Sequence, residues 1–184
     1  RLTDVTGVQT CALPIFAGRG VCIGLKMGGA GDVSAGPGFS SKQEDSVTDE
    51  TRETIAFLNR LLEAERAGVK VLARLIPDIR NETVAELARS FLRDEGMNCQ
   101  VLKTMIENMR GTVSPAVGDF VEKVEALSSM EEKLDLLVRG QEWVARQIRK
   151  NRSMALTAPD RLFLESIKVQ HEHNVDALKD ALNG

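Results

Sequence analysis

The chain contains no tyrosine, and aromatic residues make up only 4% of its 184 positions. Chemistry that depends on a tyrosyl radical or on a phenolic acid is therefore excluded. The three cysteines, Cys11, Cys22 and Cys99, are too few and too scattered for a disulfide framework, so we expect a reducing, cytoplasmic location. No apolar run approaches the roughly 20 residues that a membrane-spanning helix needs, so we expect no membrane partner.

The sequence also lacks a large excess of positive or negative charge. The sequence has 24 Lys and Arg against 27 Asp and Glu, a formal net charge of −3, and no basic run that would predict a nucleic-acid partner. Its 42% hydrophobic and 28% charged residues suit one globular domain with a core. No nucleophile motif such as G-x-S-x-G occurs, and the glycine-rich "GGAGDVSAG" follows no predicted strand. Catalytic residues and a cofactor-binding loop are therefore not assigned.

The first 45 residues differ in character from the rest of the chain. Residues 5–15, "VTGVQTCALPI", resemble the codon-by-codon translation of a common sequencing adapter, and we interpret residues 1–16 as an artefact of that kind. This interpretation removes Cys11 from functional arguments. We expect the Gly-rich residues 17–45 to be disordered, and we leave open whether they are native. The folded domain is expected to span residues 46–184.

Within that domain, apolar periodicity and capping residues predict four long helices. They run from Ser46 to about Ile76, from the cap Asn81 to about Arg110, from the capping box at Ser128 and Ser129 to about Lys150, and from Thr157 to about Leu182. No useful length of sequence alternates with period two, so the fold class is all-α. The connection 111–128, with a short helix expected near 119–126, is long enough to make the second and third helices parallel.

Each predicted helix has polar residues at the centre of its otherwise apolar core-facing positions. These residues are Glu65 in the first helix, Glu95 and Asn98 in the second, Gln141 in the third, and His171 and Asn174 in the fourth. All lie near their helix midpoints, and at a rise of about 1.5 Å per residue they reach one level. The sequence therefore predicts a buried polar layer. Because an unpartnered buried carboxylate costs several kcal/mol or takes up a proton, the layer should be hydrogen-bonded, bind a metal or relay protons.

Four segments, "FLNRLLEAERAG", "RDEGMNCQVL", "RGQEWVARQIRK" and "HEHNV", together resemble a small bacterial ferritin-like family of unassigned function, over roughly residues 50–180. The resemblance implies a ferritin-like four-helix bundle with a long crossover connection between helices 2 and 3. Ferritin-like di-iron proteins supply a Glu from each of two helices and Glu-x-x-His from each of the other two. On this basis Glu65, Glu95 and His171 are candidate metal ligands. Glu142 is a further candidate, although it lies one residue beyond Gln141, which occupies the expected position.

Other positions depart from the di-iron pattern. Asn98 stands where a His is expected, and Lys168 stands where a Glu is expected. Cys99 and Glu172 lie next to ligand positions and are considered as substitutes. Cys99 is also counted with the predicted polar layer, although alone it suits a small core residue. The remaining match of two carboxylates and one imidazole still resembles a set that could hold a single ion.

Two functions are therefore kept. The first is a ferritin-like protein of unknown biochemical role with a degenerate, metal-free polar layer, which Arg66 or Arg139 could join. The alternative is an iron or manganese protein with oxygen or peroxide redox activity or metal storage; an enzyme of this kind would be a non-haem metal oxidoreductase. For oligomerisation, a homodimer is left open.

Overall fold

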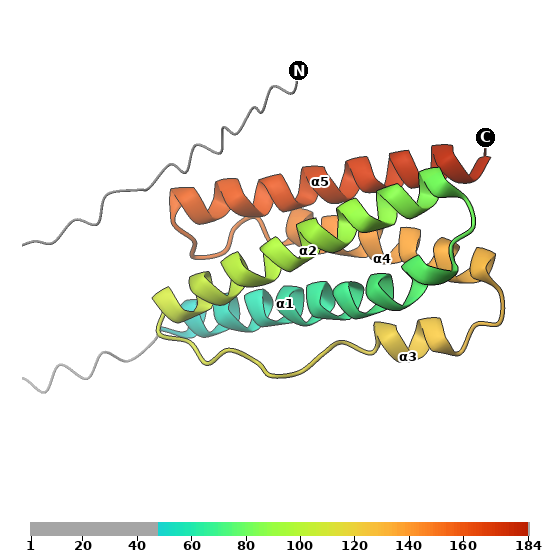
Figure 1. Cartoon of the computed structure of the whole chain (residues 1–184). Helices are drawn as coiled ribbons and strands as arrows, with labels where there is room; N and C mark the ends of the chain where they lie inside the picture. The colour runs from blue at the N-terminus through green and yellow to red at the C-terminus, as the bar shows by residue number, and fades with distance from the viewer. Residues whose placement is uncertain (1–47, 184) are drawn as a thin grey trace, which may run out of the picture. The chain divides into compact units, whose positions relative to one another are not determined.

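The computed structural model describes residues 48–183, which contain helices and connections but no strand (Figure 1). The elements are α1 (Asp49–Leu75), the short 3₁₀ helix η1 (Ile76–Asp78), α2 (Glu82–Asn108), α3 (Phe120–Glu125), α4 (Met130–Lys150) and α5 (Ala158–Asn183). The all-α prediction is confirmed for this part of the chain. The predicted adapter-derived segment 1–16, the predicted disorder of residues 17–45, and Cys11 and Cys22 lie outside the described residues.

The helix ends follow from local capping chemistry. The side chain of Asn81 accepts a hydrogen bond from the Val84 amide at 3.2 Å, and Ser129 forms a complete capping box with Glu132 at the start of α4. The first helix begins at Asp49 rather than at Ser46, because the Thr48 side chain caps it by accepting from the Thr51 amide. The predicted bounds are therefore correct to within a few residues, and the short helix expected in the connection is α3.

The four long helices lie side by side, with extensive packing of α1 on α2, of α4 on α5 and of α2 on α5. In Figure 1, α1 and α5 run in one direction and α2 and α4 in the other. The connection after α2 returns along the outside of α1 before α3 and α4 begin. Helices α1 and α4 pack less closely than any of these three pairs.

Apolar side chains form a core on both sides of the helix midpoints. One cluster includes Phe57, Leu58, Leu61, Leu62, Leu102, Met105, Ile106, Val144, Ile148 and Ile167. The other includes Leu72, Val84, Ala88, Phe91, Leu134, Leu137, Val138, Val175 and Leu178. Burial of each large aliphatic side chain contributes about 1.5–3 kcal/mol to folding, so the two clusters hold the helices together above and below the midpoint.

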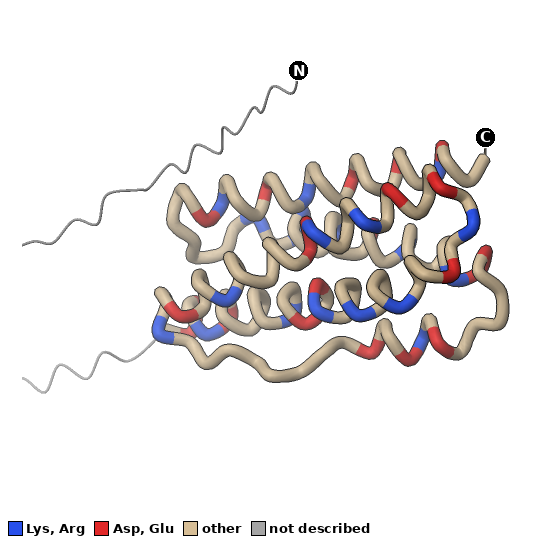
Figure 2. Tube along the Cα trace, viewed as in Figure 1, with Lys and Arg blue, Asp and Glu red and all other residues tan. Residues whose placement is uncertain are grey.

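Charged residues of both signs are interspersed along the helices, as Figure 2 shows for α1 and α2. Within residues 48–183, no helix combines the length and the hydrophobicity needed to cross a membrane.

Three residues on the outer face of α1 fix the connection between α2 and α3. Asn59 donates from Nδ2 to the Thr112 carbonyl at 2.9 Å and accepts from the Ser114 amide at 2.7 Å. The Glu63 carbonyl oxygen accepts from the Gly118 amide at 3.1 Å, and Arg66 donates to the carbonyl oxygens of Ser114 and Ala116. Arg66 therefore stabilises the connection, and the suggestion that it joins the polar layer is wrong.

We expect Asn59→Ala to lower the free energy of unfolding by about 1–3 kcal/mol, because both functions of the amide satisfy backbone groups of the connection. Urea denaturation measures the loss, and hydrogen exchange at the Ser114 amide should accelerate. Asn108→Ala, at an exposed position at the end of α2, is the matched control and should change stability by less than about 0.5 kcal/mol. Equal effects of the two substitutions would contradict this account.

Candidate functional site

The polar residues predicted from the helix midpoints are all buried. Glu65 and His171 are each 1% exposed and Glu95 is 2% exposed. Asn98, Gln141 and Asn174 are also buried. Because α1, α2, α4 and α5 each place an apolar face inward, the polar residue at the centre of each face is forced into the same interior region. We call these six residues the polar layer.

Amide side chains satisfy one oxygen of each buried carboxyl. Asn98 donates from Nδ2 to Glu65 Oε2 at 3.3 Å and to Gln170 Oε1 at 3.0 Å. Gln141 donates from Nε2 to Glu95 Oε1 at 2.6 Å. The same Gln141 accepts from Asn174 Nδ2 at 3.0 Å through its own carbonyl oxygen, so the layer is linked across all four long helices.

Gln170 was not identified from the sequence, because it lies one residue before His171 and off the core-facing positions. It is only partly buried, and no pattern in the sequence distinguishes it from a surface glutamine.

The tautomer of His171 follows from its contacts. Its Nδ1 lies 2.9 Å from the carbonyl oxygen of Ile167, and since a carbonyl oxygen only accepts, Nδ1 donates the proton. In the neutral ring Nε2 is then an acceptor. This Nε2 lies 3.4 Å from Glu65 Oε1, so a proton on that carboxyl oxygen would face the imidazole lone pair.

Burial makes the neutral forms of these groups the stable ones. Burial raises the pKa of Glu65 to about 8, although the hydrogen bond from Asn98 opposes the shift. Burial, and then the nearby Glu65, raise the pKa of Glu95 well above its usual range. Burial lowers the pKa of His171 to about 4. These shifts favour protonated carboxyl groups and a neutral imidazole, which reduces the cost of burying the layer.

Gly68 makes room for the side chain of Glu95. A Cβ added at Gly68 would lie 2.0 Å from Glu95 Oε2 and 2.8 Å from its Cδ. The glycine is buried one turn after Glu65 on α1, so it lets a carboxyl from α2 lie directly against the backbone of α1. Gly96, also inside a helix, has no atom within 4 Å of such a Cβ.

Two carboxyl oxygens of the layer have no hydrogen-bond partner among the described residues. They are Glu65 Oε1 and Glu95 Oε2, both fully buried. A pocket of about 520 Å³ lies at the weakly packed face between α1 and α4. Its lining comes from α1, α3, α4 and the connection before α3, together with Glu95 of α2 and His171 of α5. Four residues of the polar layer, Glu65, Glu95, Gln141 and His171, are therefore among those that line this pocket.

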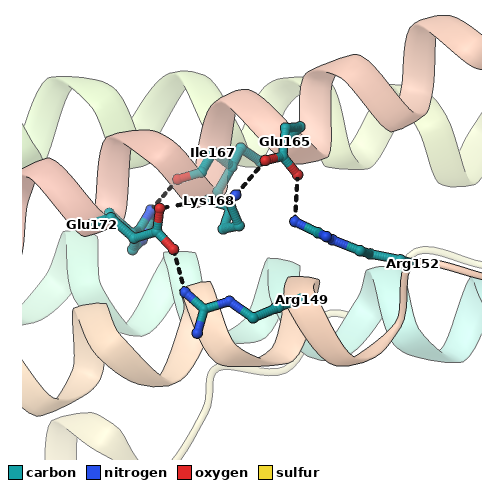
Figure 3. A network of polar contacts seen from close by, with 7 residues as sticks. Arg149, Arg152, Glu165, Ile167, Lys168 and Glu172 are labelled. Carbon is teal, nitrogen blue, oxygen red and sulfur yellow. Dashed lines mark hydrogen bonds and ion pairs between the residues drawn. The ribbon is translucent and has the colours of Figure 1, made fainter.

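Lys168 takes part in an ion-pair network on α4 and α5 instead of the layer (Figure 3). Its ammonium group pairs with Glu165 and lies 3.9 Å from Glu172 Oε2. Glu172 also pairs with Arg149, and Arg152 lies 3.6 Å from Glu165. Glu172 is thus not brought to the metal-ligand position for which it was considered.

Glu142 and Cys99 also lie outside the predicted site. Glu142 is one residue beyond Gln141, a rotation of about 100° around the helix, and its Oε1 lies 2.7 Å from the Lys179 ammonium group on the outer face. Its assignment as a metal ligand is therefore a wrong prediction. Cys99 packs partly buried against the apolar cluster near Leu102, and burial raises the pKa of its thiol to about 12. Cys99 therefore belongs to the apolar packing beside the layer.

These positions do not fit a di-iron centre. Carboxylates in such centres bridge two ions through both oxygens, whereas Asn98 and Gln141 each donate to one oxygen of Glu65 and Glu95. In residues 48–183, no group of three or more His, Cys, Asp or Glu side chains is placed to hold a metal ion. The amides at two ligand positions thus use the oxygen atoms that a second ion would need.

Comparison with known proteins identifies the family of the chain. A family model described as "Domain of unknown function (DUF6306)" matches residues 52–180, which contain the whole polar layer. No match to the chain was found among curated proteins or among solved structures. Because the matched segment covers well over half of the sequence, the chain belongs to the DUF6306 family.

Proposed function

We propose that residues 46–184 form a ferritin-like four-helix bundle with a crossover connection, in which a metal-free polar layer replaces the di-iron centre. In this proposal the domain is a non-catalytic binding module, and the layer is the polar end of a small-molecule site. The main supporting observation is that Glu65 Oε1 and Glu95 Oε2 are buried without hydrogen-bond partners in two residues that line the pocket.

The physical argument is that such atoms are costly unless a ligand satisfies them. A buried polar atom without a partner costs about 1–3 kcal/mol, and here two of them share one pocket. The pocket volume of about 520 Å³ lies within the usual range for small-molecule sites. Hydrogen bonds to the other oxygen of each carboxyl fix the two groups in place, so the site is ordered before a ligand enters.

A second candidate is a single iron or manganese ion held by Glu65, Glu95 and His171. The observation that favours it is the separation of 3.4 Å between Glu65 Oε1 and His171 Nε2, with Nδ1 fixed by the Ile167 carbonyl. A second ring nitrogen bonded to a carbonyl is a common support of metal-binding histidines. Binding would require Glu65 to lose its proton, so affinity would increase with pH.

Metal analysis separates the two candidates. The full chain is incubated with Mn²⁺, or with Fe²⁺ without oxygen, then desalted and analysed by mass spectrometry for metals. We expect well under one ion per chain, because two amides take the place of anionic or imidazole ligands. The same measurement on Glu65→Gln and on the outer-face variant Glu142→Gln provides matched controls. One ion per chain that is lost in Glu65→Gln and kept in Glu142→Gln would overturn the metal-free proposal in favour of the second candidate.

A further inference from the structure

We propose that the pocket between α1 and α4 binds an unbranched amphipathic carboxylate, with the charged group between Arg60 and Arg146 and the apolar chain extended along α4. The inference rests on the proposed function, because it takes this pocket as a small-molecule site, and it names the class of ligand. It uses the basic and apolar side chains of the pocket and needs no contact with the buried carboxyl oxygens of Glu65 and Glu95.

The two arginines lie at the same level on facing helices. Helices α1 and α4 run in opposite directions (Figure 1), and Glu65 and Gln141 mark the level of the polar layer on each of them. Arg60 precedes Glu65 by five residues and Arg146 follows Gln141 by five, so both lie about 7.5 Å from the layer on the same side. Nearby residues of both helices pack in one apolar cluster, as this level requires. The pair therefore flanks one end of the pocket.

Both guanidinium groups keep donors for a ligand. Within residues 48–183, Arg60 forms no hydrogen bond or ion pair, and its side chain is exposed. Arg146 reaches Glu142 Oε2 only at 3.8 Å, which is too long for a hydrogen bond, and the other oxygen of Glu142 lies 2.7 Å from the Lys179 ammonium group. Because the planar fork of an arginine matches the two oxygens of a carboxylate, two such groups across one gap suit a carboxylate.

The charges around the pocket favour an anion over a cation. Outside the polar layer, its acidic lining residues are Glu63 and Asp119, and both are occupied. Glu63 accepts from the Ser114 hydroxyl, and Asp119 lies 2.7 Å from the Lys123 ammonium group. The basic lining residues number four, because Lys123 and Arg139 add to the arginine pair. The excess of positive charge attracts anionic ligands.

The pocket wall beyond the arginine pair is apolar. Leu136, Leu137 and Val144 line it over about 12 Å of α4. Phe120 of α3 lines it as well and lies against the α4 backbone at Gly140, where an added Cβ would be 2.9 Å from the ring. An unbranched hydrocarbon chain can extend along this wall, so each CH₂ group that leaves water adds to the affinity.

The test titrates the full chain with hexanoate, octanoate and decanoate, and with decanol and decylammonium, which have the longest chain without the negative charge. Fluorescence of Trp143, the one tryptophan in the sequence, which lines the pocket, follows binding, and calorimetry gives the stoichiometry. We expect one decanoate per chain and an affinity that rises about two- to fourfold for each added CH₂ group. Decanoate should bind about three- to tenfold more tightly than decanol, and decylammonium more weakly than either.

Variants assign the two ends of the ligand. Arg60→Ala/Arg146→Ala should weaken decanoate binding about three- to tenfold and leave decanol binding unchanged, because exposed ion pairs are individually weak. The matched control Lys70→Ala/Arg80→Ala removes two exposed positive charges outside the pocket lining and should leave both affinities unchanged. Leu136→Asn should weaken decanoate and decanol alike, because it places a polar side chain beside the apolar chain. Thermal unfolding checks that each variant is folded.

The outcomes separate this inference from the proposed function. Equal affinities for decanoate and decanol, or equal effects of the arginine pair and the control pair, would overturn the carboxylate end of the ligand. Unchanged binding in folded Leu136→Asn would overturn the placement of its chain. If the chain binds neither metal nor decanoate, the ligand class is wrong while the metal-free layer stands. One ion per chain held through Glu65 would refute the proposed function, a result that does not depend on the decanoate titrations.

Discussion

Raising the pH from about 6.5 to 8 should lower the free energy of unfolding by about 2 kcal/mol through Glu65 alone. The pKa of this carboxyl is about 8 in the folded chain against an ordinary value of 4.5, so the folded state binds more protons throughout that interval. Its stabilising proton is therefore lost as pH rises towards 8. The raised pKa of Glu95 acts in the same direction and increases the loss.

His171 has the opposite effect at lower pH. Its pKa is about 4 in the folded chain against an ordinary 6.5, so the unfolded state binds more protons between these values and stability rises with pH. From about pH 4.5 to 6.5 His171 offsets the slope of one of the two carboxyl groups. Above pH 6.5 that offset ends, so the decline of stability with pH should become steeper.

Urea denaturation at a series of pH values measures this profile. Glu65→Gln should reduce the decline above pH 6.5, because the glutamine amide is uncharged and does not ionise in this interval. Adding Glu95→Gln should remove most of the remaining slope. Glu53→Gln, which removes an exposed carboxyl on α1, should leave the profile unchanged. If the free energy of unfolding of the wild type stays constant from pH 6.5 to 9, protonation of the layer does not stabilise the fold. A decline that the double substitution leaves unchanged would lead to the same conclusion.

Gly68→Ala and Gly96→Ala should change stability in opposite directions, although both replace a glycine inside a helix. Alanine normally stabilises a helix interior by about 0.5–1 kcal/mol relative to glycine, and we expect this gain at Gly96, where an added Cβ meets no atom within 4 Å. At Gly68 the added Cβ would overlap Glu95 Oε2. The Glu95 side chain could move away only by giving up its 2.6 Å hydrogen bond from Gln141, so a loss of about 1–3 kcal/mol is expected.

A double-substitution cycle checks the cause of that loss. In a Glu95→Ala background the overlap is absent, so adding Gly68→Ala should no longer destabilise the chain. The loss of stability caused by Gly68→Ala should therefore be about 1–3 kcal/mol smaller in that background than in the wild type. Thermal and urea unfolding of the four proteins give the required free energies. The explanation would be refuted by a stabilising Gly68→Ala in the wild-type background, or by an equal loss in both backgrounds.

Much of the fold was predictable because its signals are local. Asn81 and the Ser129–Glu132 capping box mark helix starts through contacts within three residues. The burial of Glu65, Glu95 and His171 was predictable too, because a regular helical period decides which residues face inward. Because the polar residues lie near the centres of helices of similar length, packing the helices side by side brings them to the same level.

The errors concern side chains whose direction depends on neighbours distant in sequence. Glu142 differs from Gln141 by one helical step, which is enough to turn it outward to Lys179 on α5. From the sequence, Arg66 could either join the polar layer or remain outside it. The structure shows the connection lying along α1, where Arg66 donates to two of its carbonyl oxygens. Glu172 and Lys168 are occupied by partners on α4 and α5 that no spacing in the sequence indicates.

The sequence by itself determined the helices, their inward faces and the presence of a polar level among apolar residues, because each depends on period and capping within one segment. Only the tertiary structure decided which oxygen of each carboxyl an amide would satisfy and which would stay without a partner. It also decided that a pocket between α1 and α4 would be lined by both residues. The reason is that hydrogen bonds and packing gaps between helices depend on their relative position and rotation, and those are set by the whole core at once.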